Sequence, residues 1–199
     1  MRLVQVECPK CGLPIPPERN QGDTILLCTS CGAFHTRNGE ARLVEVSVAL
    51  PNRPGPGALV YVPFWRVLGY VRIFSEQVSG GTLWRLAQLF TGTTQPNEGW
   101  VNVFVPATPV GPDTFKAWAT GFTNRPPMLR PAAGLGESPR LPTLIATDVA
   151  AKLADFIILS NEAEKPGTLQ SISYSFDPRE FHLHYFPFYW DGQAYQVGL

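Results

Sequence analysis

The residues of this chain best suited to chemistry are four cysteines in two CxxC pairs near its amino end. Two residues separate Cys8 from Cys11 and Cys28 from Cys31, and sixteen residues lie between the pairs. A tight turn with this spacing lets both sulfurs of a pair reach one ion, and two such turns form a tetrahedral cage of thiolates. Because 15 to 20 residues between the pairs is typical of zinc sites, the sequence predicts one metal ion held by these four cysteines.

A glycine follows the second cysteine of each pair, at Gly12 and Gly32, and allows backbone N–H groups to turn toward sulfur. With these CxxCG turns, residues 1–46 resemble a zinc ribbon, and the turns also resemble the knuckles of rubredoxin-type domains. The first resemblance implies a structural zinc, and the second implies an iron that carries one electron. Tetrahedral sulfur ligation fits both metals, and zinc is favoured as the usual occupant of such ribbons.

Catalysis is not expected at this metal. A site with four cysteine ligands has no open position for water or substrate, so it is not suited to hydrolysis. The sequence also lacks the GxSxG, Walker, HExxH and GxGxxG patterns. We therefore predict no catalytic and no cofactor-binding residue beyond the four cysteines, although an enzyme with a family-specific site is left open.

The three histidines offer the remaining ligand-type side chains. His35 follows Cys31 by four residues, and with four cysteines present we expect it on the surface or beside the ligands. His182 and His184 alternate along a predicted strand, so they share a face with Glu180 and could form a second metal site or an active site. The favoured interpretation is a strand with two solvent-facing histidines, with Glu180 in a turn.

The charge balance argues against nucleic acid as the main ligand. Sixteen Lys and Arg balance sixteen Asp and Glu, and within the first 46 residues five basic residues balance five acidic ones. A phosphate-binding ribbon needs a cationic face, because counterion release supplies most non-specific affinity. A nucleic-acid-binding zinc ribbon therefore ranks below a protein-binding one.

Residues 47–199 are predicted to form a β-rich body, which makes the chain mainly β, of the α+β class. Apolar, β-branched and aromatic runs indicate strands at residues 43–48, 59–65, 67–74, 100–105 and 115–118. One helix is expected at about 148–164, and a shorter one is possible at 83–90. Asp177 and Pro178 suit a type I turn, which predicts a C-terminal hairpin of residues 169–176 and 181–190.

An aromatic–proline–aromatic pattern occurs twice, at residues 61–65 and 185–190. Since proline cannot donate to a strand ladder, we expect both prolines at an edge, at a bulge or where pairing ends. The favoured interpretation is two similar strand ends in one core. The alternative is an internal duplication whose strand ends line a cleft or a partner surface.

Only 16% of the residues are charged and 12% are aromatic, which favours a body with an apolar contact surface. We expect a non-catalytic accessory subunit that docks onto a protein partner or a second copy of itself. Its apolar patch is expected at the strand ends around Phe64–Trp65 and Phe188–Trp190. Residues 1–6 show no leader pattern, no apolar run is long enough to span a membrane, and paired CxxC cysteines suit the reducing cytoplasm, where we place the protein.

Overall fold

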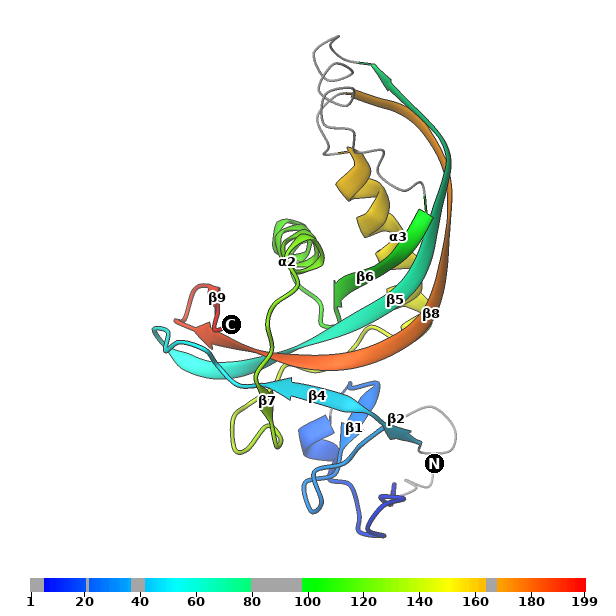
Figure 1. The fold of residues 1–199 in the computed structure, drawn as a ribbon. Helices are drawn as coiled ribbons and strands as arrows, with labels where there is room; N and C mark the ends of the chain where they lie inside the picture. The colour runs from blue at the N-terminus through cyan, green and yellow to red at the C-terminus, as the bar shows by residue number, and fades with distance from the viewer. Residues whose placement is uncertain (1–5, 21, 37–41, 80–97, 164–167) are drawn as a thin grey trace.

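The computed structural model describes residues 6–20, 22–36, 42–79, 98–163 and 168–199. Its main feature is a pair of very long antiparallel strands, β5 (Ala58–Ser79) and β8 (Thr168–Trp190). Figure 1 shows them as a curved ribbon, with the small cysteine-bearing sheet below β4 and helices α2 and α3 within the curve. The predicted mainly β, α+β class is confirmed.

The larger sheet has six strands in the order β6-β5-β8-β4-β7, and β9 also pairs with β8. β6 (Glu98–Pro106) lies antiparallel to β5, whereas β4 (Val46–Ala49) lies parallel to β8. The short strands β7 (Pro131–Ala132) and β9 (Tyr195–Val197) complete it. The two strands predicted at 59–65 and 67–74 both lie within β5, which is one continuous strand.

The smaller sheet has three antiparallel strands in the order β1-β2-β3 and carries the cysteine pairs. Its strands are β1 (Ile25–Leu27), β2 (Phe34–Thr36) and β3 (Leu43–Val44), and the short 3-10 helix η1 (Pro17–Asn20) precedes them. The chain then passes directly into β4 of the larger sheet. One stretch of sequence, predicted as a single strand at 43–48, thus contributes a strand to each sheet.

Two helices pack against the larger sheet. α3 (Thr147–Ala163) lies where the sequence predicts a helix at about 148–164, and α2 (Pro112–Asn124) was not predicted. The prediction of a strand at 115–118 was wrong. Pro112 at the helix start and Asp113 in its first turn are good helix-start signals, and they outweigh the strand preference of the aromatic residues that follow. The possible helix at 83–90 lies outside the described residues.

Each face of the larger sheet carries its own apolar cluster. On one face, Tyr61, Val67 and Leu183 pack with α3 and with Ile25 and Phe34 of the smaller sheet. On the other face, a mostly aromatic cluster packs against Phe122 of α2 and the C-terminal residues, and its sheet members are Ala49, Val60, Val62, Phe64, Phe104, Phe186 and Phe188. The larger sheet is thus covered on both faces. The smaller sheet together with its two CxxCG turns, which we call the cysteine module, covers part of one face.

The two aromatic–proline–aromatic segments pair with each other. Tyr61 lies opposite Pro187, and Pro63 lies opposite Tyr185, so the repeat sits near the start of β5 and at the end of β8, as two neighbouring strand ends. Pairing of β5 with β6 ends at Phe64, next to Pro63, which agrees with a proline placed where pairing ends. Because Pro63 and Pro187 are buried, these parts of the repeat belong to the core, which agrees with the favoured interpretation.

The predicted turn at Asp177–Pro178 is not formed, and the hairpin of residues 169–176 and 181–190 was wrong. β8 runs straight through these residues, and the register against β5 shifts there, with Gly69 opposite Pro178 and Leu68 opposite Glu180. A Cβ at Gly69 would lie 2.2 Å from the Phe176 ring, so the close approach requires glycine. The irregular register accommodates Pro178 within the strand, so the chain does not reverse direction there.

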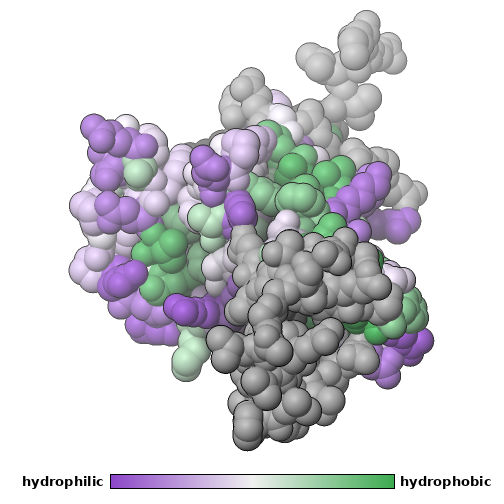
Figure 2. Space-filling model, turned by 90° about the horizontal axis from the view of Figure 1, so that it is seen from above, coloured by the Kyte–Doolittle hydropathy of each residue, from purple (hydrophilic) through white to green (hydrophobic). Residues whose placement is uncertain are grey.

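The exposed aromatic residues differ from those expected. Phe64, Trp65 and Phe188 are buried, so the predicted patch is wrong at these residues, whereas Trp190 is 37% exposed. Instead, Trp100 of β6 and Phe74 of β5 are 61% and 62% exposed. Figure 2 shows apolar surface interspersed with hydrophilic surface on the side seen from above. In the described part of the chain, no helix is both long and apolar enough to cross a bilayer.

Candidate metal centre

The two CxxCG turns have the same local geometry. The Cys8 N–H donates to the Leu13 carbonyl and the Gly12 N–H to the Cys8 carbonyl, at 2.9 and 2.7 Å. The second turn repeats this with Cys28, Gly32 and Ala33, at 2.9 and 2.8 Å. Gly12 and Gly32 have φ of 72° and 71°, the left-handed region that favours glycine. The glycines therefore close two matched knuckles that face each other.

The four sulfur atoms form a compact group. All lie within 4.8 Å of one another, with Cys8 and Cys31 Sγ 3.6 Å apart and Cys11 and Cys28 Sγ 3.7 Å apart. A tetrahedral ion with metal–sulfur bonds of about 2.3 Å requires sulfur–sulfur distances of about 3.8 Å. The cluster has the ligand type, number and spacing that a single tetrahedral zinc or iron ion needs. Either metal fits it.

The thiols influence one another strongly. Burial raises the pKa of Cys28, but backbone N–H groups of Cys31 and Ser30 and the neighbouring thiols bring it down to about 7. For Cys11, the N–H of Leu13 lowers the pKa, whereas desolvation and the other three thiols raise it to about 12. Four thiolates so close together repel one another, so full ionisation requires a bound cation. The arrangement favours metal binding over four free thiols.

His35 lies beside this cluster and not on the surface. Its side chain is fully buried, and its Nε2 lies 3.1 Å from Cys8 Sγ. The Nε2–H can donate to a Cys8 thiolate, which orients the ligand and offsets part of its negative charge. Burial and the charge of Lys10 lower the pKa of His35, which keeps the ring neutral. Of the two expected positions for His35, surface or beside the ligands, the first was wrong.

A buried polar network joins the cysteine module to the body. Arg140 lies 2.7 Å from the Asp23 carboxylate and donates to Asn20 Oδ1 and to the Tyr185 hydroxyl, at 3.1 and 2.9 Å. Asp23 also accepts from the backbone N–H of Thr143, and the Thr143 carbonyl accepts from Thr24. These bonds satisfy polar groups on both sides of the contact. The module is therefore held in a fixed position on the sheet.

An aromatic contact reinforces this network. Phe34 of β2 stacks on Tyr185 of β8 with ring centroids 5.4 Å apart, and the Arg140 guanidinium lies over the Tyr185 ring, 5.7 Å from its centroid. Sequence patterns gave no signal for the pairing of Asp23 with Arg140, because an isolated acid in a turn and an isolated arginine in a loop are common. Only the fold brings these residues together.

The histidine pair of β8 lies far from the cysteines in sequence and differs from its prediction. Glu180 lies within the strand rather than in a turn, and it is exposed. His182 is partly buried and His184 is only 6% exposed, so the strand does not present two solvent-facing histidines. Among the residues described, the only group of at least three potential metal ligands is the cysteine cluster. The alternative of a second metal site formed by Glu180, His182 and His184 therefore finds no support among the described residues.

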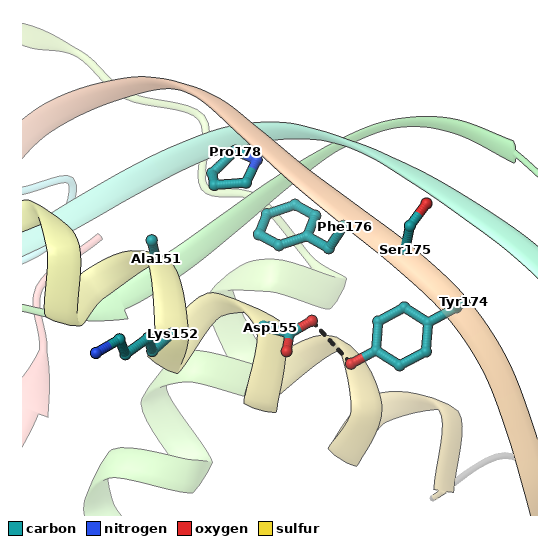
Figure 3. Close-up of a pocket in the computed structure, with 7 residues that line it drawn as sticks. All are labelled: Ala151, Lys152, Asp155, Tyr174, Ser175, Phe176 and Pro178. Atoms are coloured by element: carbon teal, nitrogen blue, oxygen red, sulfur yellow. Dashed lines mark hydrogen bonds between the residues drawn. The ribbon is translucent and has the colours of Figure 1, made fainter.

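A shallow pocket of about 480 Å³ lies between α3 and β8 (Figure 3). Phe176 and Pro178 give it an apolar floor, and Lys152 stands at its margin on α3. The Tyr174 hydroxyl donates to Asp155 Oδ1 at 2.8 Å, and burial together with this bond raises the pKa of Tyr174 to about 12. The Asp155 carboxylate is thus held by the tyrosine hydroxyl at the edge of the pocket.

Comparisons with protein-family models, with curated proteins and with solved structures give no match to this chain. The function must therefore be argued from the chain's own residues. Of these, the four-cysteine cluster and its attachment to the sheet are the best defined.

Proposed function

We propose that this protein is a non-catalytic accessory subunit in which a zinc-loaded ribbon module braces a curved β-sheet body that docks onto a protein partner. The coordinatively closed thiolate cluster supports a structural role for the metal. The buried network around Arg140 supports a rigid attachment of the module to the sheet. Rigid surfaces bind with less loss of conformational entropy, which suits a docking subunit.

The observation that carries this proposal is the aromatic surface around Trp100. Tyr70 and Trp100 lie opposite each other on β5 and β6, with ring centroids 5.4 Å apart, and Trp100 is 61% exposed. Arg72 lies near the Tyr70 ring and pairs with Glu98 at 2.6 Å, so charged groups border the aromatic ones. Tryptophan, tyrosine and arginine are the residues most enriched at the energetic centres of protein interfaces.

Site-specific crosslinking tests the docking role. A photoreactive residue placed at position 100 should crosslink the full-length protein to one partner chain or to a second copy, and Trp100→Ser should abolish assembly in light scattering. Met128→Ser is the matched control, because Met128 is apolar and 89% exposed but lies outside this surface. If the protein remains monomeric, forms no crosslink from position 100 and is retained by random DNA or RNA in a salt-sensitive manner, the nucleic-acid alternative replaces this proposal.

Electron transfer through iron is the second candidate. Cys11 is exposed and Cys31 is partly exposed, so one side of the cluster reaches the surface, as an electron-transfer centre requires. Elemental analysis and visible absorption separate the two functions, since ferric tetrathiolate is coloured and zinc is colourless. We expect one zinc per chain and no colour. One iron per chain with a reversible visible band would establish the electron-transfer alternative.

A further inference from the structure

A second polar cluster lies on the larger sheet, on the face opposite the cysteine module. The register places Arg66 of β5 opposite His182 of β8 and Ser47 of β4 beside His184, so all four side chains share one face. The two imidazole centroids are 4.7 Å apart, and His182 Nε2 lies 2.8 Å from Ser47 Oγ. We call these four residues the Arg66–His184 cluster.

The cluster contains buried polar atoms that have no partner within the described part of the chain. They are both ring nitrogens of His184 and the Nε of Arg66. His184 is only 6% exposed, so solvent does not replace the missing bonds freely. A neutral imidazole carries one donor and one acceptor, and an arginine Nε–H is a fixed donor. Unpartnered buried groups of this kind are exceptional and point to a bound molecule.

The surroundings bury one side of the cluster and leave the other side partly exposed. Toward α2, the rings of Phe104 and Phe186 lie 6.2 and 5.7 Å from the His184 ring and belong to the buried aromatic cluster. On the other side, Arg66 and His182 are only partly buried. The side of the cluster that reaches the surface is therefore formed by Arg66 and His182, and a small group would reach His184 by displacing these two side chains.

The charges select an anion. Arg66 carries a permanent positive charge, and of the described carboxylates only that of Glu45 acts noticeably on His182. Burial, followed by the charge of Arg66, lowers the pKa of His182, and burial, His182 and Arg66 bring that of His184 to about 3. Both rings are thus neutral at pH 7. A second cation would be repelled by the guanidinium, whereas an anion would be attracted to it.

We propose that the Arg66–His184 cluster binds the oxyanion of a small molecule, a carboxylate or a phosphate, which accepts from the Arg66 Nε–H and from a His184 ring N–H. Such bonds to an ionised acceptor are the strong class of hydrogen bond, and they would satisfy the donors that the fold leaves unpaired. The site is independent of the metal centre and of the docking role. It gives the body a ligand of its own.

The test follows the histidine ring nitrogens of the full-length, metal-loaded protein by nuclear magnetic resonance. Inorganic phosphate and acetate are titrated separately at constant ionic strength, and His184→Gln assigns the signal. We expect a saturable shift of His184, and binding roughly tenfold weaker in Arg66→Met. The control is Arg72→Met, because Arg72 lies on the same strand, pairs with Glu98 and is 53% exposed. This control should bind as the wild type does.

The two anions distinguish the source of the ligand: tighter phosphate binding indicates a phosphorylated molecule, and tighter acetate binding indicates a carboxylic acid. The proposal fails if neither anion shifts His184 saturably, or if Arg66→Met binds as well as the wild type. A second equivalent of metal bound at His182 and His184 would also overturn it. If Arg66→Met does not fold, the wild-type titration still tests the proposal, because the absence of a saturable His184 shift would contradict it.

Discussion

The guanidinium of Arg140 lies 2.7 Å from the carboxylate of Asp23, although 117 positions separate them in the sequence. Their side chains are only 8% and 3% exposed, so the ion pair is almost fully removed from water. A buried pair of this kind is costly to form and costly to break, and its additional partners decide the balance. Here Tyr185, Thr143 and Asn20 supply those partners, which makes the pair a connection between the cysteine module and the body.

Replacement of Arg140 by methionine should destabilise the protein strongly. The change removes the guanidinium that pairs with the buried Asp23 carboxylate, and breaking a buried pair typically costs about 3–5 kcal/mol in the free energy of unfolding. Urea denaturation followed by circular dichroism measures this. Arg72→Met is the control, because its ion pair with Glu98 is about half exposed and should contribute about 0–1 kcal/mol. Equal losses in the two variants would contradict the role assigned to Arg140.

Replacement of Cys28 by serine should remove the metal and destabilise the cysteine module. Cys28 is fully buried, and metal binding is coupled to folding in modules of this size. Because Phe34 stacks on Tyr185, we also expect the near-ultraviolet signal of the body to change, while its strands remain. Metal content and circular dichroism are measured together. Thr29→Ser, at an exposed position in the same knuckle, should keep full metal content. A Cys28→Ser protein that retained it would show that Cys28 is not a ligand.

His35 should strengthen metal binding without being a ligand. Phenylalanine at this position fills the buried space but cannot donate to Cys8 Sγ, so we expect a metal affinity about tenfold lower with the stoichiometry unchanged. Competition with a chelator of known affinity measures the change. His182→Gln provides the control, because this histidine belongs to the separate Arg66–His184 cluster. Loss of the metal altogether would instead make His35 part of the coordination sphere.

His184 should make the protein less stable in acid. Its pKa is about 3 in the folded chain and about 6.5 when unfolded, so between these values only the unfolded state binds the proton. Stability should therefore fall as the pH decreases from about 6.5 toward 3, by up to about 1.4 kcal/mol per unit, and be unaffected above pH 7. Urea midpoints of His184→Gln across this range should show a shallower decline. Parallel declines in the two proteins would indicate that His184 does not cause the effect.

The cysteine cluster was predictable because its information is local. Each CxxCG turn needs only its own residues to bring two sulfurs together, and the left-handed Gly12 and Gly32 follow from the same short motif. The strands around Val67 and Val103 were also predictable, because runs of β-branched residues mark buried strands at any place in a fold. The helix at 147–163 showed clear start and stop signals.

The errors arose where distant residues decide the structure. Asp177–Pro178 has the chemistry of a turn, yet it remains in a strand because Gly69 on the partner accepts the irregular register. His184 follows an alternating pattern that suggests exposure, yet the aromatic cluster around Phe186 buries it. The link from Asp23 to Arg140 required the whole fold. A single sequence contains no local signal for contacts of this kind.

The pairing of β5 with β8 joins parts of the chain that are far apart in the sequence. Ala58 pairs with Trp190 and Val62 with Phe186, so most of the central ladder joins residues more than a hundred positions apart. Such non-local pairing closes large loops and is slow. About 150 residues separate His35 from Tyr185, which at 5 to 20 residues per second is a translation delay of roughly 8 to 30 seconds. During this interval the two CxxCG turns and their small sheet lack the contact with β8. A metal ion bound early would then be the main interaction that stabilises them before β8 is synthesised.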